Sequence, residues 1–196
     1  MLSDKAYLAL EAQGKKSGIP IEVLNGIKPS MALMMLTLQE LTKIGVSQEG
    51  VDIHYHNAGL RDGKSIKALE TANFQIKLLT TLGEGIESEF VLFGLKDLDQ
   101  VQSQFDELID AWKKGDMVAL EKLFIADIAE YPELYAKMLV NRNHSWIAQI
   151  QAFLQTPAIE LVLVGVAHAA GEDGLLHLLG QQGYSIEQLN AGTAED

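Results

Sequence analysis

The chain has 196 residues, is 47% hydrophobic and carries a formal net charge of −12, so it can bury a core while presenting an acidic surface. Such a surface repels nucleic-acid phosphates and anionic membranes, which disfavours both as partners. There is no cysteine, which excludes disulfides and thiol chemistry, and no apolar run approaches the roughly 20 residues of a transmembrane helix.

The first third of the chain is predicted to be helical. Ser3 can cap a first helix, residues 18–20 interrupt it, and Pro29 suits the first turn of a second helix. This second helix carries a stripe of apolar residues at helical spacing, namely Met31, Met34, Met35, Leu38 and Leu41. A methionine stripe is more typical of core packing than of a binding surface. No signal peptide precedes the first helix.

A third helix is predicted from Val51 to Arg61, and a short strand from Lys64 to Leu69. Thr71 can cap the helix that follows. Glu70 would then lie between the end of a strand and the start of a helix, a position where functional side chains often gather.

From about residue 85 to residue 156 the pattern is helix after helix, and Pro132 opens a long helix that ends near Gln155. This stretch is far longer than a usual crossover between parallel strands. We therefore expect residues 85–156 to form a helical cap over the ends of the strands.

A continuous apolar run from Leu161 to Ala167 predicts a strand buried on both faces, with His168 at its carboxyl end. In open α/β sheets, chemistry gathers at such strand ends. The alternative is a hydrogen-bonded histidine that only closes the strand. A helix from Glu172 to Gln181, a short strand from Tyr184 to Leu189 and a flexible tail over 190–196 complete the chain.

These elements predict a single helix-rich α/β domain over residues 1–196, with a small, mostly parallel sheet of two to four strands. A strand as apolar as Leu161–Val166 normally has neighbours on both sides, so the sheet is expected to be incomplete. An exposed sheet edge invites pairing between chains, which predicts a homo-oligomer.

Arg142 stands inside the apolar stripe of the predicted long helix, three residues after Leu139 and four before Trp146. A buried arginine is unfavourable unless it is paired or binds an anion. Two interpretations remain open here. Arg142 either binds a ligand together with its neighbour Asn143, or it extends from a buried stem towards a carboxylate. The candidate carboxylates are Glu70 and the pair Glu172 and Asp173.

His168 and Glu70 together offer one imidazole and one carboxylate, which is part of a metal site. A catalytic divalent ion requires about three protein ligands and an open position for water. The metal-free alternative uses His168 or Glu70 as a general base, with Arg142 stabilising an anion.

Several motifs resemble the TraB/GumN family, which is related to the Tiki-type metalloproteases and the erythromycin-esterase/ChaN-like group. The matching segments are, in chain order, Gly50-Val51-Asp52, Leu69-Glu70-Thr71 with Gln75, Tyr131-Pro132-Glu133-Leu134-Tyr135, Arg142-Asn143, Val164-Gly165-Val166-Ala167-His168, Gly171-Glu172-Asp173-Gly174-Leu175-Leu176 and Gly183-Tyr184. The segment ending at His168 resembles the second Gly-x-x-His motif of that family. The first such motif has no counterpart here, so the resemblance suggests an incomplete or inactive member.

The resemblance implies a metal-dependent hydrolase, with peptide hydrolysis among its reactions and Mn²⁺ or a similar ion as cofactor. It implies His168 and Glu70 as metal ligands or bases, and Arg142 as a catalytic or substrate-binding residue. Asn143 and Gln75 would complete the substrate site. Bacterial members of the family are often exported to the periplasm or lipid-anchored. The alternative function is a non-catalytic module that binds a peptide or a protein.

Overall fold

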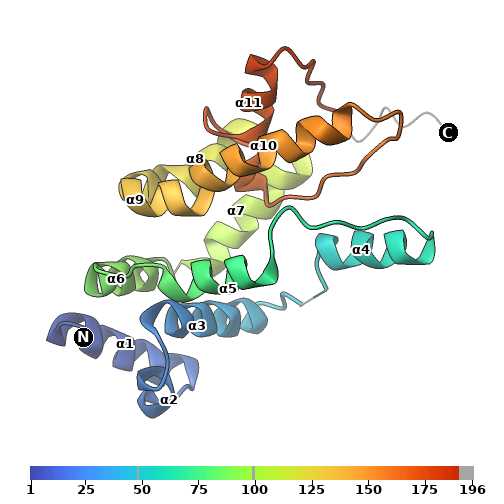
Figure 1. Ribbon diagram of the computed structural model, residues 1–196. Coiled ribbons are helices and arrows are strands. Elements are labelled where there is room, and N and C mark those ends of the chain that lie inside the picture. Colours follow the sequence, from blue (N-terminus) through green and yellow to red (C-terminus); the bar gives the residue numbers. More distant parts are fainter. Residues whose placement is uncertain (48, 99, 190–196) are drawn as a thin grey trace. The chain divides into compact units, whose positions relative to one another are not determined.

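The computed structural model describes residues 1–47, 49–98 and 100–189, so the predicted flexible tail lies outside the described residues. The chain divides into two compact units, Met1–Phe105 and Asp106–Asp196 (Figure 1). No helix in the described part is both long and apolar enough to cross a membrane.

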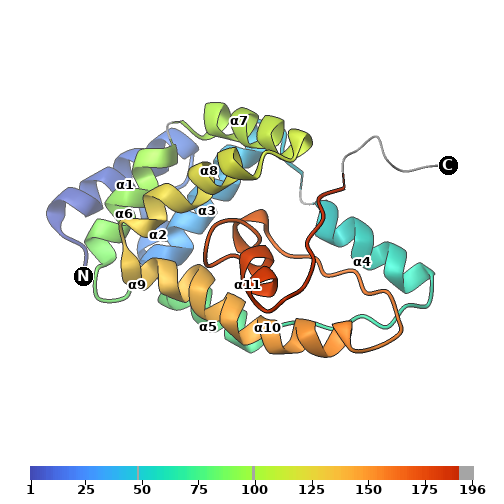
Figure 2. The same cartoon turned by 90° about the horizontal axis from the view of Figure 1, so that it is seen from above.

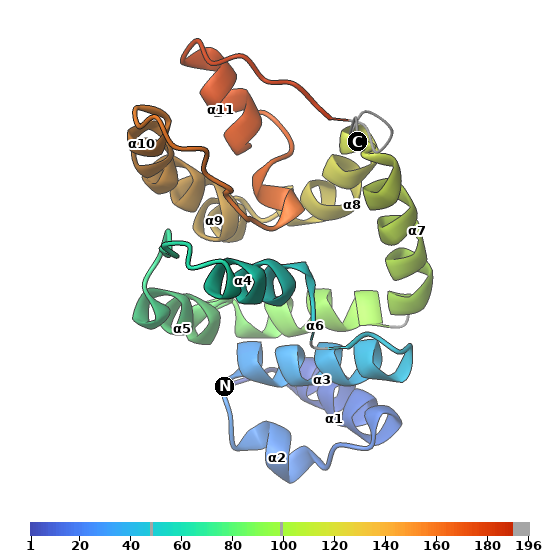
Figure 3. The same ribbon diagram turned by 90° about the vertical axis from the view of Figure 1, so that its right-hand side faces the viewer.

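The N-terminal unit consists of helices. These are α1 (Asp4–Ser17), α2 (Ile21–Asn25), α3 (Pro29–Lys43), α4 (Val51–Arg61), α5 (Ala72–Thr81) and α6 (Glu87–Leu98), and α7 (Val101–Lys114) begins at its end. Helix α3 lies alongside both α1 and α6 (Figure 3). Leu10, Leu36 and Val91 are fully buried where these helices meet. Because burial of apolar surface dominates folding, this three-helix contact is the core of the unit.

The helix boundaries follow the predicted capping signals. The Ser3 side chain accepts a hydrogen bond from the Ala6 N–H, and the Thr71 side chain accepts one from the Phe74 N–H. Pro29 occupies the first turn of α3. The predicted methionine stripe of α3 is wrong as a core face, because the buried face carries Leu33 and Leu36 and leaves Met35 exposed.

The C-terminal unit is built around one long helical segment. After α8 (Met117–Ala129), helix α9 (Pro132–Tyr135), the π-helix η1 (Ala136–Val140) and α10 (Asn141–Leu154) follow one another without a break (Figure 2). The 3₁₀ turn η2 (Val166–His168) and α11 (Leu175–Gln181) complete the unit. A small apolar cluster of Ile125, Leu139 and Ala170 joins α8, the π-helix and the turn after His168.

The predicted α/β fold is wrong. Among the described residues there is no β-strand, and the predicted strands at 64–69, 161–167 and 184–189 are extended or turn segments without strand partners. Apolar alternation favours an extended backbone, but a strand exists only where a neighbouring backbone supplies its hydrogen bonds. The helices within residues 85–156 therefore do not cap a sheet, and no sheet edge for oligomerisation is formed among the described residues.

Candidate functional site

His168 lies in the 3₁₀ turn η2 and is 7% exposed. Its Nδ1 lies 2.6 Å from Oδ1 of Asn143 on α10, a short hydrogen-bond distance. Asn143 itself is only 1% exposed. The two predicted site residues therefore meet inside the C-terminal unit, although they are 25 positions apart in the chain.

The orientation of the Asn143 amide determines which nitrogen of His168 carries the proton. Asn143 Nδ2 donates a hydrogen bond of 2.7 Å to the backbone carbonyl of Asp173, so Oδ1 is the atom that faces the imidazole. An amide oxygen only accepts hydrogen bonds, and the Nδ1 atom of His168 must therefore be the donor. In the neutral imidazole this leaves the lone pair on Nε2, the nitrogen that can act as a base or a ligand.

Asp173 accepts hydrogen bonds from two residues of this cluster. Its carboxylate accepts a hydrogen bond of 2.9 Å from the hydroxyl of Tyr135, while its backbone carbonyl accepts the one from Asn143. Burial, the hydrogen bond to Asp173 and the charges of Asp173, Glu121 and Glu172 raise the pKa of Tyr135 to about 12. Tyr135 therefore stays protonated and keeps donating to Asp173 throughout the physiological range.

Burial, together with this hydrogen bond, predicts an unusual titration for Tyr135. In ultraviolet absorbance, the difference between wild type and Tyr135→Phe is expected to show a phenol that ionises near pH 12, rather than near the ordinary value of 10. The neutral phenol stabilises the fold below pH 10, and this contribution is lost as the pH rises towards 12. Asp173→Asn is expected to bring the midpoint down towards 10. A midpoint near 10 in the wild type would contradict the geometry.

Arg142 is half-buried and lies beside the same cluster. Its Nη1 donates a hydrogen bond of 3.0 Å to the carbonyl of Met138 in the π-helix, and its guanidinium carbon lies 4.9 Å from the ring centre of Trp146. A π-helix widens the backbone and often marks a functional position. The arginine is therefore held by a backbone carbonyl and a cation–π contact, which explains how the apolar stripe accommodates it.

Trp146 connects the arginine to the histidine. Its ring centre lies 4.5 Å from that of His168, and the residue is 4% exposed. The indole N–H has no hydrogen-bond partner among the described residues. A buried donor without a partner is unfavourable by about 1–3 kcal/mol, so this indole stores a local destabilisation in the middle of the cluster.

Glu70 and Gln75 lie in the N-terminal unit, at the start of α5. Gln75 Nε2 donates a long hydrogen bond of 3.4 Å to Glu70 Oε2, so these two predicted residues meet each other. His168, Arg142 and Asn143 belong to the C-terminal unit. Glu70 and Gln75 are therefore described within their own unit, and the geometry of the candidate site below is that of the C-terminal unit.

The described residues do not fit a metal centre. No three histidine, aspartate or glutamate side chains among them are grouped closely enough to hold an ion. The C-terminal unit offers His168, whose Nδ1 is already bound to Asn143, and the carboxylate of Asp173 is bound by Tyr135. A catalytic divalent ion requires about three protein ligands, so this donor set is insufficient.

Tyr135 and Trp146 were not among the predicted site residues, and Asp173 was considered only as a carboxylate partner of Arg142. Trp146 was expected in the apolar stripe of the long helix, where it does lie. The available signal is that Tyr135, Asn143 and Trp146 fall at helical spacing on one face, so a polar side chain stands between two aromatic rings. Their convergence on the turn that carries His168 is a tertiary contact without a local sequence pattern.

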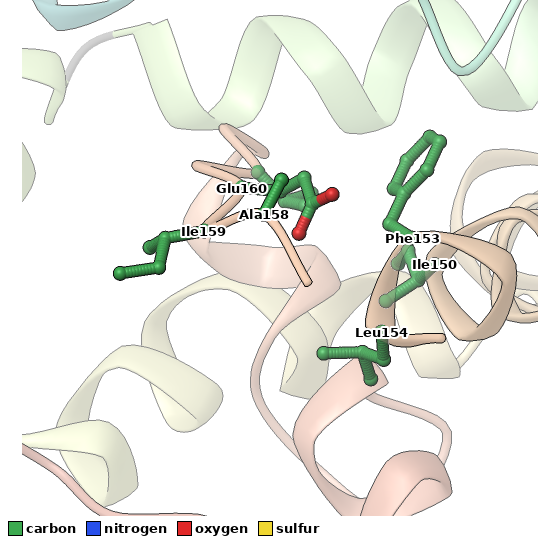
Figure 4. A pocket seen from close by; sticks show the side chains of 7 residues that line it. Ile150, Phe153, Leu154, Ala158, Ile159 and Glu160 are labelled. Carbon is green, nitrogen blue, oxygen red and sulfur yellow. The ribbon is translucent and has the colours of Figure 1, made fainter. Parts of the chain in front are cut away.

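An apolar groove of about 280 Å³ lies beside the end of α10 (Figure 4). Helix α10 contributes Ile150, Phe153 and Leu154, and the extended chain after it contributes the opposite wall. That wall consists of Ala158, Ile159, Glu160 and Val162. Of the described residues that line the groove, Glu160 alone is charged.

A comparison with models of known families matches residues 1–188 to the model described as the TraB/PrgY/gumN family. No curated protein and no solved structure matches the chain.

Proposed function

Because the chain belongs to the TraB/PrgY/gumN family, we propose that it acts as a hydrolase in which His168 is the general base. The observation that carries this proposal is the orientation of the Asn143 amide, which leaves the lone pair of His168 on Nε2. A general base needs an unprotonated nitrogen held in one orientation, and a third group that orients the base is a recurrent feature of such sites.

In the proposed reaction His168 Nε2 takes a proton from the water molecule that attacks the carbonyl carbon of a peptide bond. The imidazolium then gives this proton to the leaving amine as the C–N bond breaks, which yields a carboxylic acid and an amine and restores the neutral ring. The Nδ1 proton stays hydrogen-bonded to Asn143, which keeps the ring in place and helps to stabilise the imidazolium that forms. Asn143 is kept in its own orientation by Asp173. The guanidinium of Arg142, which is half-buried beside the Trp146 ring, supplies positive charge for the oxyanion that forms.

The cofactor implied by the family resemblance, a divalent ion such as Mn²⁺, would draw on His168 and Glu70. The described residues contain no group of three such donors that could hold it. The proposed chemistry therefore uses the side chains of the C-terminal unit and takes no step through a metal. It follows that hydrolysis by this chain should survive EDTA.

The proposal is tested by incubating the purified chain with a pool of internally quenched fluorogenic peptides. We expect cleavage that falls by about 10²–10⁴-fold in His168→Ala, the range typical of a lost general base. The matched control is His144→Ala, which removes an exposed imidazole from α10 and should leave cleavage unchanged. Equal cleavage by the two variants, or complete loss in EDTA, would contradict the proposed chemistry.

The second candidate is a non-catalytic module that binds peptides, and the apolar groove beside α10 favours it. Binding pockets are mostly apolar with a few polar groups, as this one is. The two candidates differ in their dependence on the histidine. A binding module retains its peptide in His168→Ala and cleaves none in the wild type.

A further inference from the structure

The segment Ile159–Val164 lies outside helices and turns, and its backbone has no hydrogen-bond partner within the part of the chain that the structure describes. None of its backbone groups makes a hydrogen bond to another described residue; the nearest such bonds are from the Ala158 N–H to the Thr156 hydroxyl and from the His168 N–H to the Gly165 carbonyl. Backbone donors and acceptors almost always find partners in folded proteins. An extended segment whose edges are open is a template to which another strand can add.

The side chains of this segment alternate as they do in a strand. Leu161 and Leu163 are exposed, whereas Val162 and Val164 are half-buried against the unit. Successive side chains of a strand point to opposite faces, so this alternation gives the segment the geometry of a strand already. A second extended chain would therefore meet a preformed edge.

The groove lies directly beside this edge, and its lining determines which side chains a bound peptide should carry. Its walls are apolar except for Glu160, whose Oε1 accepts a hydrogen bond of 2.6 Å from the Thr156 hydroxyl. An apolar side chain with a cationic neighbour complements such a groove. The net charge of −12 also favours a cationic partner and opposes a second copy of the same chain through like-charge repulsion.

The same segment continues through Gly165 into the turn that carries His168. We propose that Ile159–Val164 binds a cationic peptide in extended conformation by strand addition, with an apolar side chain of the peptide in the groove. This inference rests on the proposed hydrolase function, because it names the substrate class and the direction from which that substrate approaches His168.

The test uses a defined probe, a fluorescein-labelled peptide of alternating valine and threonine with a lysine at each end, followed by fluorescence anisotropy. We expect it to bind roughly tenfold or more tightly than the same peptide with glutamate ends. N-methylation of alternate amides of the peptide should abolish binding, because a methylated amide cannot donate a backbone hydrogen bond to the segment. Equal binding of the lysine and glutamate forms, or of the methylated form, would overturn the proposal.

Two proline variants show which edge of the segment binds the peptide. Neighbouring residues of a strand direct their N–H groups to opposite edges, so Leu161→Pro blocks one edge and Val162→Pro blocks the other. At least one of the two proline variants is expected to lower the affinity for the probe roughly tenfold. The matched variant Leu161→Ala keeps the backbone donor and should change the affinity less. Neither N–H is used within the described chain, so both variants should retain the wild-type melting temperature. Unchanged affinity in both proline variants would exclude this segment.

The His168→Ala variant separates this inference from the proposed hydrolase function. Intact binding of the probe without any cleavage by the wild type supports strand addition and contradicts the hydrolase. Cleavage that depends on His168, together with unchanged affinity in both proline variants, supports the hydrolase and contradicts strand addition. A dimer of the unliganded chain that Leu161→Pro converts to a monomer would show that a second copy occupies the edge, and would overturn the proposal.

Discussion

Replacing Asn143 by alanine is expected to lower the free energy of unfolding by about 3 kcal/mol. The change removes a fully buried amide, and it leaves the His168 Nδ1–H and the Asp173 carbonyl without their hydrogen bonds. Each buried polar group that loses its partner is unfavourable by about 1–3 kcal/mol. Urea denaturation followed by tryptophan fluorescence measures this loss, since Trp146 lies in the same cluster.

The matched control is Asn141→Ala on the same helix. Asn141 is exposed, and its substitution should change the free energy of unfolding by less than about 0.5 kcal/mol. Comparable small losses in the two variants would mean that the buried amide does not hold the histidine. The role of Asn143 in the proposed site would then be wrong.

Replacing Gly174 by alanine is expected to destabilise the turn that follows His168. The added Cβ would overlap the carbonyl oxygen of Ala170 and lie 2.6 Å from that of Ala169. Both are backbone atoms and cannot rotate away, so the turn itself must move. Overpacking of this kind lowers the free energy of unfolding by about 1–3 kcal/mol.

Helix α11, which follows this turn, provides a control substitution with the opposite expected sign. Gly180 lies within α11, and a Cβ built there meets no atom within 4 Å. Gly180→Ala should therefore stabilise the protein by roughly 0.5–1 kcal/mol, because alanine loses less backbone entropy than glycine in a helix. Thermal melting of the two variants measures the contrast. A destabilisation by Gly180→Ala as large as that by Gly174→Ala would contradict the packing described around the turn.

The helices of this chain could be predicted because their signals are local. Ser3, Pro29 and Thr71 identify helix starts through their own side chains or rings, and the structure places helices directly after them or at them. The sheet could not be predicted in the same way. The apolar run that begins at Leu161 favours an extended backbone, which the structure has, but pairing depends on a partner that no local pattern reveals.

The candidate site shows the same division between local and tertiary information. Arg142 was predicted as a site residue because a cation interrupts an apolar stripe. Asn143 was predicted with it because it is the next residue. The pairing of Asn143 with His168, and the role of the Asp173 carbonyl in orienting it, depend on the packing of the turn against α10. The π-helix also has no sequence pattern from which it could have been predicted. Its Met138 carbonyl accepts the hydrogen bond from Arg142.

The position of the proton on His168 tests the account most directly. A long-range ¹H–¹⁵N correlation spectrum of the uniformly labelled chain reports which ring nitrogen is protonated, and His168→Ala assigns the signal among the five histidines. We expect a neutral ring protonated at Nδ1 in the wild type, and we expect this preference to be lost in Asn143→Ala. A wild-type ring protonated at Nε2 would contradict the proposed base, because that nitrogen would then have no lone pair to accept a proton.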